Sequence, residues 1–201
     1  MNLKNKTVII TGGKRVGRAV ALALADKGCN IVLTYNSSKE IIEKTIKEIE
    51  KKDVKALAMK TDVTNSDDVK KLMKTVYEKF GSVDVLINMA SFFPKIRFED
   101  LTEEDFDKNI SVDLKGAYLC SLEAAKYFKK NKISKIINFS DWAIDRPYSS
   151  YLPYMIAKGG VVTLTKNLAK ELAPNVFVNA IAPGQVLLPE NIDAKQESHL
   201  R

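Results

Sequence analysis

Short apolar runs rich in β-branched residues alternate with longer segments of helical periodicity along most of this chain. The apolar runs are nearly continuous, without the polar alternation of half-exposed strands, which is typical of strands buried on both faces. Such strands form parallel sheets, and the helices between them cover both faces. The pattern therefore predicts an α/β fold built on a doubly wound parallel sheet, with residues 1–201 in a single domain.

The predicted strands span residues 7–11, 31–35, 55–60, 83–88, 135–140 and 176–181. The predicted helices span residues 18–27, 40–51, 67–80, 106–130 and 151–172. In sheets of this kind, ligands bind at the carboxyl ends of the strands, near the point where the strand order reverses. Residues that directly follow a strand are therefore the first candidates for a functional site.

Composition narrows the classes of function. Hydrophobic residues make up 45% of the 201 residues, as in an ordinary globular protein. We expect no membrane association, because no apolar run approaches the length needed to cross a bilayer and the N-terminus lacks a secretory signal. Cys29 and Cys120 lie far apart and show no metal-ligand spacing. We therefore expect a cytoplasmic protein without a metal site.

The formal net charge of +7 raises the possibility of a nucleic-acid partner. Most of this charge comes from lysines interleaved with acids, as in Glu43-Lys44 and Lys47-Glu48. That pattern is typical of solvated helix faces. We expect a small-molecule substrate and no nucleic acid.

A glycine-rich loop follows the first predicted strand and opens the first helix, with the sequence TGGKRVG over residues 11–17. Glycines at such a place let the backbone approach a pyrophosphate at the helix N-terminus. The loop departs from the commonest dinucleotide fingerprint, because Arg15 and Val16 stand where another glycine is expected. The expected cofactor contacts in this loop are Gly12, Lys14, Arg15, Val16 and Gly17.

The end of the second predicted strand bears on the choice of cofactor. An acid there accepts hydrogen bonds from the ribose 2′-hydroxyl of NAD and repels a 2′-phosphate. This chain instead has Tyr35, Asn36 and Ser37, with no acid before Glu40. Lys14, Arg15 and Ser37 together suit a phosphate dianion, so the sequence predicts NADPH.

Tyr154 and Lys158 lie four residues apart in the last predicted helix, which places both side chains on one face. An ammonium close to a phenol favours the phenolate, so we expect Lys158 to lower the pKa of Tyr154 from its usual value of about 10. This segment resembles the Tyr-x-x-x-Lys centre of the short-chain dehydrogenases/reductases. The resemblance implies that Tyr154 and Lys158 are catalytic and also contact the cofactor.

Further segments resemble the same family in order along the chain. Asp62-Val63 resembles its adenine-contacting segment, residues 88–91 stand at its Asn-Asn-Ala-Gly segment, and residues 179–184 match the segment that meets the nicotinamide. The resemblance covers residues 6 to about 190 and implies a Rossmann-type domain that binds NADP(H). It adds the following expected cofactor contacts: Asp62, Val63, Asn88, Ala90, Ser91, Pro183 and Gly184.

Three departures from the family pattern resemble its pteridine reductase branch, which includes bacterial dihydromonapterin reductases. Asp141 replaces the usual catalytic serine, Ser91-Phe92-Phe93 follows the fourth strand, and Lys14-Arg15 occupies the first loop. In that branch an aromatic ring and the nicotinamide sandwich a pterin. The implied substrate-binding residues are Ser91, Phe92, Phe93, Asp141 and Tyr154.

The chemistry of position 141 agrees with a heterocyclic substrate. A serine hydroxyl donates to a carbonyl oxygen that develops negative charge, whereas an ionised aspartate opposes that charge. A carboxyl group binds the amino groups and ring nitrogens of a pterin, or in its neutral form helps to protonate them. We therefore expect an NADPH-dependent reductase of a dihydropteridine- or dihydrofolate-type substrate, with Asp141 catalytic. The enzymatic alternative is a carbonyl reductase, such as a 3-oxoacyl-acyl-carrier-protein reductase.

A third alternative is an NADP-binding protein without turnover. Asp113 stands where the family has an asparagine that helps to hold a water leading to the lysine, so it adds a charge to the expected proton relay. The family also continues for several dozen residues beyond the Pro-Gly segment. The sequence therefore predicts a chain without the usual C-terminal edge strand, either as a fragment or as a short variant. We expect a homo-oligomer: a dimer on the helices at 106–130 and 151–172, or a tetramer in a full-length form.

Overall fold

The computed structural model describes residues 2–129, 132–184 and 186. Its strands are β1 (Thr7–Thr11), β2 (Asn30–Tyr35), β3 (Ala56–Lys60), β4 (Val85–Asn88), β5 (Ser134–Phe139) and β6 (Val176–Ile181). Its main helices are α1 (Val16–Ala25), α2 (Lys39–Glu50), α3 (Ser66–Phe80), α4 (Glu103–Asn109), α5 (Gly116–Ala125) and α6 (Leu152–Glu171). The predicted α/β architecture is confirmed.

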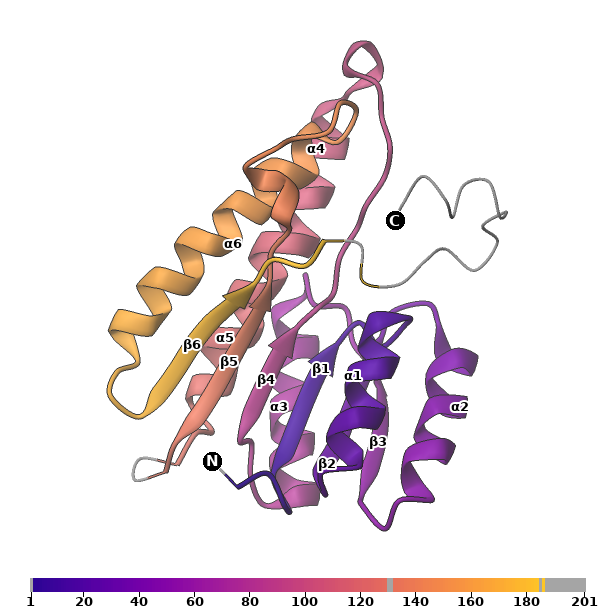
Figure 1. The fold of residues 1–201 in the computed structure, drawn as a ribbon, viewed down its shortest axis with the longest axis vertical. Coiled ribbons are helices and arrows are strands. Elements are labelled where there is room, and N and C mark those ends of the chain that lie inside the picture. Colours follow the sequence, from indigo (N-terminus) through magenta and orange to yellow (C-terminus); the bar gives the residue numbers. More distant parts are fainter. Residues whose placement is uncertain (1, 130–131, 185, 187–201) are drawn as a thin grey trace.

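The strands form one parallel sheet in the order β3-β2-β1-β4-β5-β6 (Figure 1). Strand β1 pairs on one side with β2, where Ile9 faces Val32, and on the other side with β4, where Ile9 faces Leu86. The chain winds outward from β1 in one direction and then, from β4, in the other. The connections that follow β1 and β4 therefore lead to helices on opposite faces of the sheet and leave a crevice at the carboxyl ends of the strands.

Helices cover the sheet unequally. On one face, α1 and α2 pack on β1, β2 and β3 around Ile10, Leu33 and Ile42, which are fully buried. On the other face, α3, α5 and α6 enclose a second core that includes Ile9 and Leu86. Burying an aliphatic side chain of this size stabilises a fold by about 1.5–3 kcal/mol. The two cores therefore provide a rigid base for the crevice.

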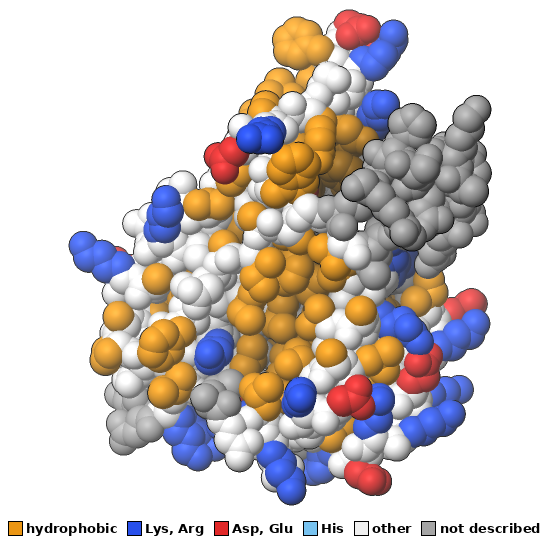
Figure 2. All heavy atoms as spheres, viewed as in Figure 1, with side chains coloured by type: hydrophobic (Ala, Val, Ile, Leu, Met, Phe, Trp, Pro, Cys, Tyr) orange, Lys and Arg blue, Asp and Glu red, His pale blue; other side chains and the backbone are white. Residues whose placement is uncertain are grey.

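On the face of the sheet where α1 and α2 pack, the strands β5 and β6 are only partly covered. Successive strand residues point to opposite faces, so Val178 joins the core on the side of the sheet that α6 covers, while Phe177 and Ile181 point the other way. These two side chains are 50% and 45% exposed. Figure 2 shows hydrophobic side chains gathered along the middle of this face.

The predicted long helix at 106–130 is the main correction to the fold. The helical segment begins earlier, where Thr102 and Asp105 form a capping box, and α4 passes into the π-helical segment η2 (Ile110–Lys115) before α5. The wider π turn changes which side chains face inward, and the i, i+4 spacing of apolar residues cannot reveal it. Helix α5 ends at Ala125, and residue 130 lies outside the described residues.

Within the part of the chain that the structure describes, no helix combines the length and apolar character required to span a membrane.

Candidate active site

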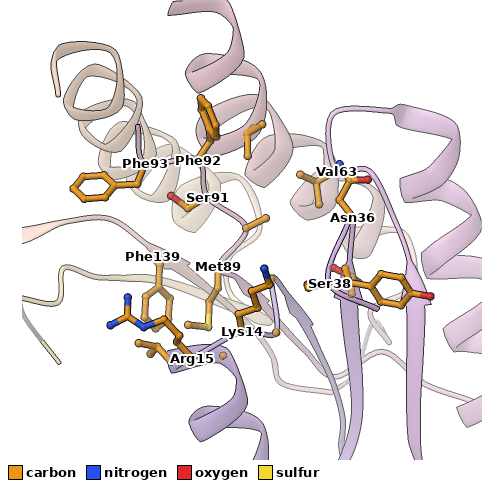
Figure 3. A pocket seen from close by; sticks show the side chains of 18 of the residues that line it. Lys14, Arg15, Asn36, Ser38, Val63, Met89, Ser91, Phe92, Phe93 and Phe139 are labelled. Atoms are coloured by element: carbon orange, nitrogen blue, oxygen red, sulfur yellow. The ribbon is translucent and has the colours of Figure 1, made fainter. Parts of the chain in front are cut away.

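A cleft of about 870 Å³ opens at the carboxyl ends of the strands (Figure 3). Every strand sends residues from its end or following loop to the wall of this cleft. The structure therefore brings most of the predicted site residues together. Those that line the cleft are Gly12, Lys14, Arg15, Val16, Gly17, Tyr35, Asn36, Ser37, Asp62, Val63, Ala90, Ser91, Phe92, Phe93, Asp141, Tyr154, Pro183 and Gly184.

The glycine-rich loop needs glycine at two positions. Gly12 has a φ of +76°, and a Cβ there would lie 2.9 Å from the carbonyl oxygen of Met89. A Cβ at Gly17 would overlap the carbonyl oxygen of Gly12. The Thr11 hydroxyl joins the loop to β4 by accepting from the backbone N–H groups of Met89 and Ala90, at 3.0 and 3.1 Å. The result is a close-packed backbone cradle at the N-terminus of α1, which suits a pyrophosphate.

The β2 end of the cleft carries hydroxyl and amide groups. This end is lined by Tyr35, Asn36, Ser37 and Ser38, and the neighbouring glycine-rich loop contributes Lys14. Asp62 also lies in the cleft, but its Oδ1 accepts from the backbone N–H and the hydroxyl of Thr64, at 2.9 and 2.8 Å. These residues fit a dinucleotide that carries a phosphate on its adenosine ribose.

Tyr154 and Asp141 make a direct contact in the cleft. The Tyr154 hydroxyl donates to Asp141 Oδ2 at 2.7 Å. Asp141 Oδ1 accepts from the backbone N–H of Ala143 at 2.9 Å, which caps the 3-10 turn η3 (Trp142–Ile144) and fixes the carboxylate. The phenol of Tyr154 and the carboxylate of Asp141 therefore form one hydrogen-bonded pair.

Lys158 lies one turn further along α6 and is 3% exposed. Its Nζ donates to the carbonyl oxygen of Phe139 at 3.0 Å and lies 3.2 Å from Asp113 Oδ1. It also lies 5.5 Å from the centre of the Tyr154 ring. The ammonium thus sits beneath Tyr154 with its charge compensated by a buried carboxylate.

The predicted lowering of the Tyr154 pKa is wrong. Burial raises the pKa of Tyr154 well above its usual value, and the hydrogen bond to Asp141 and the negative charges of Asp141 and Asp113 raise it further. The nearby ammonium of Lys158 does not reverse this, because its charge is already paired. The phenol is therefore a proton donor throughout the ordinary pH range.

The Asp113 carboxylate organises the loop after β4 as well as Lys158. Ser91 donates its hydroxyl to Asp113 Oδ1, and the backbone N–H of Phe92 donates to Oδ2 at 3.1 Å. Asn109, which the sequence prediction missed, donates its Nδ2 to the Phe92 carbonyl at 2.6 Å and to Asp113 Oδ2 at 3.3 Å. The sequence gives only one hint of this role, which is that Asn109 is a polar residue one helical turn before Asp113.

The two phenylalanines have different surroundings, and Figure 3 shows their rings pointing in different directions. Phe93 stacks on Tyr151 with ring centres 4.3 Å apart and meets Tyr154 edge-on at 4.5 Å. The Lys108 ammonium lies over the Phe92 ring, 4.4 Å from the ring centre. Phe93 is therefore the ring placed beside the Tyr154 phenol.

Asn88, a predicted cofactor contact, has its side chain below the cleft. Its Nδ2 donates to Asn138 Oδ1 at 2.8 Å and to the Ser121 hydroxyl at 3.0 Å. Asn138 in turn donates to the Thr165 hydroxyl at 2.9 Å. This buried chain of polar groups holds β4, β5 and α6 together where the cleft begins.

Several lining residues were not predicted. They surround the predicted ones and show no separate chemical signal in the sequence, except that Trp142 directly follows Asp141. They are Gly13, Thr34, Ser38, Thr61, Met89, Lys108, Val112, Phe139, Trp142, Tyr148 and Val186.

A parallel sheet with a glycine cradle after β1 and a tyrosine–lysine pair after β5 defines an oxidoreductase of the dinucleotide-binding α/β class. The particular family follows from sequence comparison: the family model described as short chain dehydrogenase matches residues 6–198. The chain belongs to this family.

Curated relatives share about a third of their residues with this chain. The 3-oxoacyl-(acyl-carrier-protein) reductase FabG of Staphylococcus epidermidis is 35% identical over 185 residues, which cover 91% of this chain and 76% of the relative. The enzyme of the same name from Staphylococcus aureus is 36% identical over 186 residues, or 90% of this chain and 75% of the relative. These relatives do not support placement in the pteridine reductase branch.

Solved structures agree with the fold. A short chain dehydrogenase from Burkholderia cenocepacia in complex with NADP has a TM-score of 0.89 at 27% identity, covering 98% of this chain and 82% of that one. An NAD+-bound xylitol dehydrogenase has a TM-score of 0.85 at 28% identity, covering 92% and 72%. The α/β domain is thus one that the family uses for oxidoreductase chemistry.

Proposed function

We propose that residues 1–201 form an NADPH-dependent reductase that reduces a C=N or C=C bond of a pterin-like substrate. The single observation that carries this proposal is the hydrogen bond from the Tyr154 hydroxyl to Asp141 Oδ2, at 2.7 Å. A carboxylate at this place matches the amino groups and ring nitrogens of a heterocycle. It opposes the negative charge that develops on the oxygen of a reacting carbonyl.

The residues that would hold NADP(H) are those of the cradle and of the β2 end of the cleft. Gly12 and Gly17 leave the backbone free to approach a pyrophosphate. Lys14 and Ser37 both line the cleft, and they would supply a cation and a hydroxyl to a ribose phosphate. The solved short chain dehydrogenase in complex with NADP supports this assignment. When bound, the reduced nicotinamide supplies the hydride.

The roles of the chain's own residues follow from their contacts. Tyr154 donates the proton, since its phenol is held in the protonated form. Asp141 accepts the hydrogen bond of Tyr154 and would orient the substrate ring. Lys158, one helical turn from Tyr154, would hold the nicotinamide ribose when the cofactor is bound. Phe93 and Ser91 line the substrate side of the cleft, and a flat ring packs well on Phe93.

A 3-oxoacyl thioester reductase is the second candidate. The 35–36% identity to relatives named as 3-oxoacyl-(acyl-carrier-protein) reductases favours it. Against it stands Asp141 in the place of the family's serine, because a carboxylate 2.7 Å from the Tyr154 hydroxyl opposes the negative charge that develops on a carbonyl oxygen.

NADPH oxidation by the purified chain tests both candidates, with dihydrobiopterin, dihydrofolate and an acetoacetyl thioester offered side by side. We expect turnover of the dihydropterins that falls about a hundredfold or more in Tyr154→Phe, which loses the proton donor but keeps the shape. Turnover of the thioester alone would favour the second candidate. Tight NADPH binding without turnover of any substrate would favour a binding protein.

A further inference from the structure

A series of aromatic side chains extends from Tyr154 and Asp141 at one side of the cleft. Phe93, Trp142, Tyr148 and Tyr151, here called the aromatic rim, contact one another in series. Trp142 meets Tyr148 at 5.9 Å between ring centres, Tyr148 meets Tyr151 at 6.3 Å, and Tyr151 stacks on Phe93 at 4.3 Å. Phe93 then meets Tyr154 edge-on. The rim thus leads directly to the phenol that donates the proton.

Three of the four rim residues are exposed, although large aromatic side chains usually anchor a core. Trp142, Tyr148 and Phe93 are 41%, 43% and 52% exposed. All three line the same cleft as Tyr154. Contiguous exposed aromatic surface inside a concave site is a feature of ligand pockets, where the apolar wall supplies affinity and a few polar groups supply orientation.

Trp142 is anchored rather than loosely placed. Its backbone N–H donates to the carbonyl oxygen of Pro183 at 3.4 Å, and it opens the turn that Asp141 caps. Its indole lies against Gly184, where an added Cβ would be 3.4 Å from the ring. The indole is therefore held between the ends of β5 and β6, next to the residue that touches Tyr154.

We propose that Trp142 and Tyr148 form a subsite for a second flat ring of the substrate, an aryl or heteroaryl arm attached to the group that is reduced. The two rings meet at an interplanar angle of 76°, so they offer an edge and a face to an incoming ring, both favourable contacts for it. The proposal rests on the proposed reduction at Tyr154, but it holds for any reducible group placed there.

Paired substrates test the subsite. One pair is a dihydropterin with an anilinomethyl arm and the same ring with a methyl group. The other pair is 4-phenyl-2-butanone and 2-hexanone. We expect kcat/KM to favour the aryl member of whichever pair is turned over by roughly three- to tenfold, the value of one or two aromatic contacts. In Trp142→Leu and in Tyr148→Leu this ratio should fall to near one.

Phe177→Leu is the matched control, because Phe177 is equally exposed but lies outside the residues that line the cleft. It should keep the aryl preference. An unvaried chain without that preference would overturn the subsite, and so would a preference that survives both rim variants. Reduction of the ketones but not of the dihydropterins would reject the proposed function while the ketone ratio still decides on the subsite.

A binding measurement keeps the proposal falsifiable if a variant fails to fold or no substrate is reduced. Trp142 is the only tryptophan in the chain, so intrinsic fluorescence reports on the subsite directly. In the unvaried chain saturated with NADP⁺, 4-phenyl-2-butanone should quench this fluorescence in a saturable way and 2-hexanone should not. Equal responses to the two ketones, or none, would reject the subsite.

Discussion

The Asp113 carboxylate lies 3.2 Å from the Lys158 ammonium, and the two side chains are 0% and 4% exposed. Family members that this chain resembles have an asparagine at this position, which helps to hold a water that leads to the lysine. The carboxylate instead compensates the lysine charge directly. Its negative charge adds to burial and to the Asp141 contact, which are the larger causes of the raised pKa of Tyr154.

Replacing Asp113 with asparagine should make Tyr154 more acidic. Burial, the bond to Asp141 and two nearby negative charges raise the pKa of Tyr154, and the variant removes one of those charges and leaves the lysine uncompensated. A group with a raised pKa loses its proton only at high pH, so the alkaline limb of the kcat profile should move to lower pH in Asp113→Asn. An unmoved limb would contradict the assignment of the raised pKa to this arrangement of charges.

The same ion pair should matter for stability. Asp113→Ala leaves the Lys158 ammonium buried without a counter-ion, and losing one partner of a buried pair costs about 3–5 kcal/mol. Asp113→Asn should cost less, since its amide oxygen still presents a partial negative charge to the Lys158 ammonium. Denaturant unfolding of the two variants measures the difference. Equal losses would mean that the charge itself contributes little.

Asn109 does not line the cleft, so its replacement tests whether it positions the loop after β4. In Asn109→Ala the partly buried Phe92 carbonyl loses its donor, a defect worth about 0.5–1.5 kcal/mol, and the loop that carries Ser91 and Phe93 should shift. We expect the KM for substrate to rise several-fold while the Kd for NADPH changes little. Asn167→Ala is the control, because Asn167 makes a similar bond to Thr163 on the exposed side of α6. Equal effects of the two variants on KM would contradict this role.

The sequence predicted the fold well because its strands carry strong local signals. Each predicted strand lies within two residues of the observed one at either end, and helices 18–27, 40–51, 67–80 and 151–172 do so as well. Buried β-branched runs, the αL glycine Gly81 that ends α3, and the Asn65 side chain that caps its start act locally. Local signals of this kind are readable from one chain.

The site was less predictable where its chemistry depends on contacts between distant residues. Tyr154 and Lys158 follow from their spacing, but the pKa of Tyr154 is raised by its burial and by its contact with Asp141, with a smaller contribution from Asp113. Asn109 is equally hidden, since its partner is a backbone carbonyl in another loop. Such contacts arise from tertiary packing, and no spacing in the sequence encodes them.

Cofactor preference can be tested at the glycine-rich loop. Since no acid lies at the end of β2, NADPH should bind at least tenfold more tightly than NADH, a difference of about 1.4 kcal/mol. Lys14→Gln should reduce this ratio by weakening contact with the phosphate. Lys170→Gln, which makes the same charge change on the exposed end of α6, should not. Calorimetric titration with both dinucleotides measures the ratio, and equal affinities in the unvaried chain would refute the preference.

The proposed homo-oligomer also has a residue-level test. Tyr118 and Leu122 lie four residues apart on α5 and are 45% and 46% exposed, so they form one apolar stripe on the helix surface. Ile156 on α6 is 46% exposed. If these helices form a dimer, Leu122→Glu should give a monomer by light scattering. A monomeric unvaried chain at micromolar concentration would exclude the dimer.

Asp141→Ser separates heterocycle chemistry from carbonyl chemistry at one residue. The serine removes the carboxylate that accepts from Tyr154 and supplies a hydroxyl that donates to an oxygen becoming an alkoxide. We expect the variant to lose most activity on dihydropterins and to keep or gain activity on simple ketones and 3-oxoacyl thioesters. One charged contact is commonly worth about 1.5–3 kcal/mol, so the preference should move by tenfold or more.

The comparison is best made as a ratio of kcat/KM values for the two substrate classes, because a ratio does not depend on the fraction of folded enzyme. Asp145→Ser serves as a control, since Asp145 is an exposed carboxylate just beyond the same turn and does not line the cleft. It should leave the ratio unchanged. If the unvaried chain and Asp141→Ser prefer the same carbonyl substrate by the same factor, the carboxylate does not select the substrate. The carbonyl reductase function, which the FabG relatives favour, would then replace the pterin assignment.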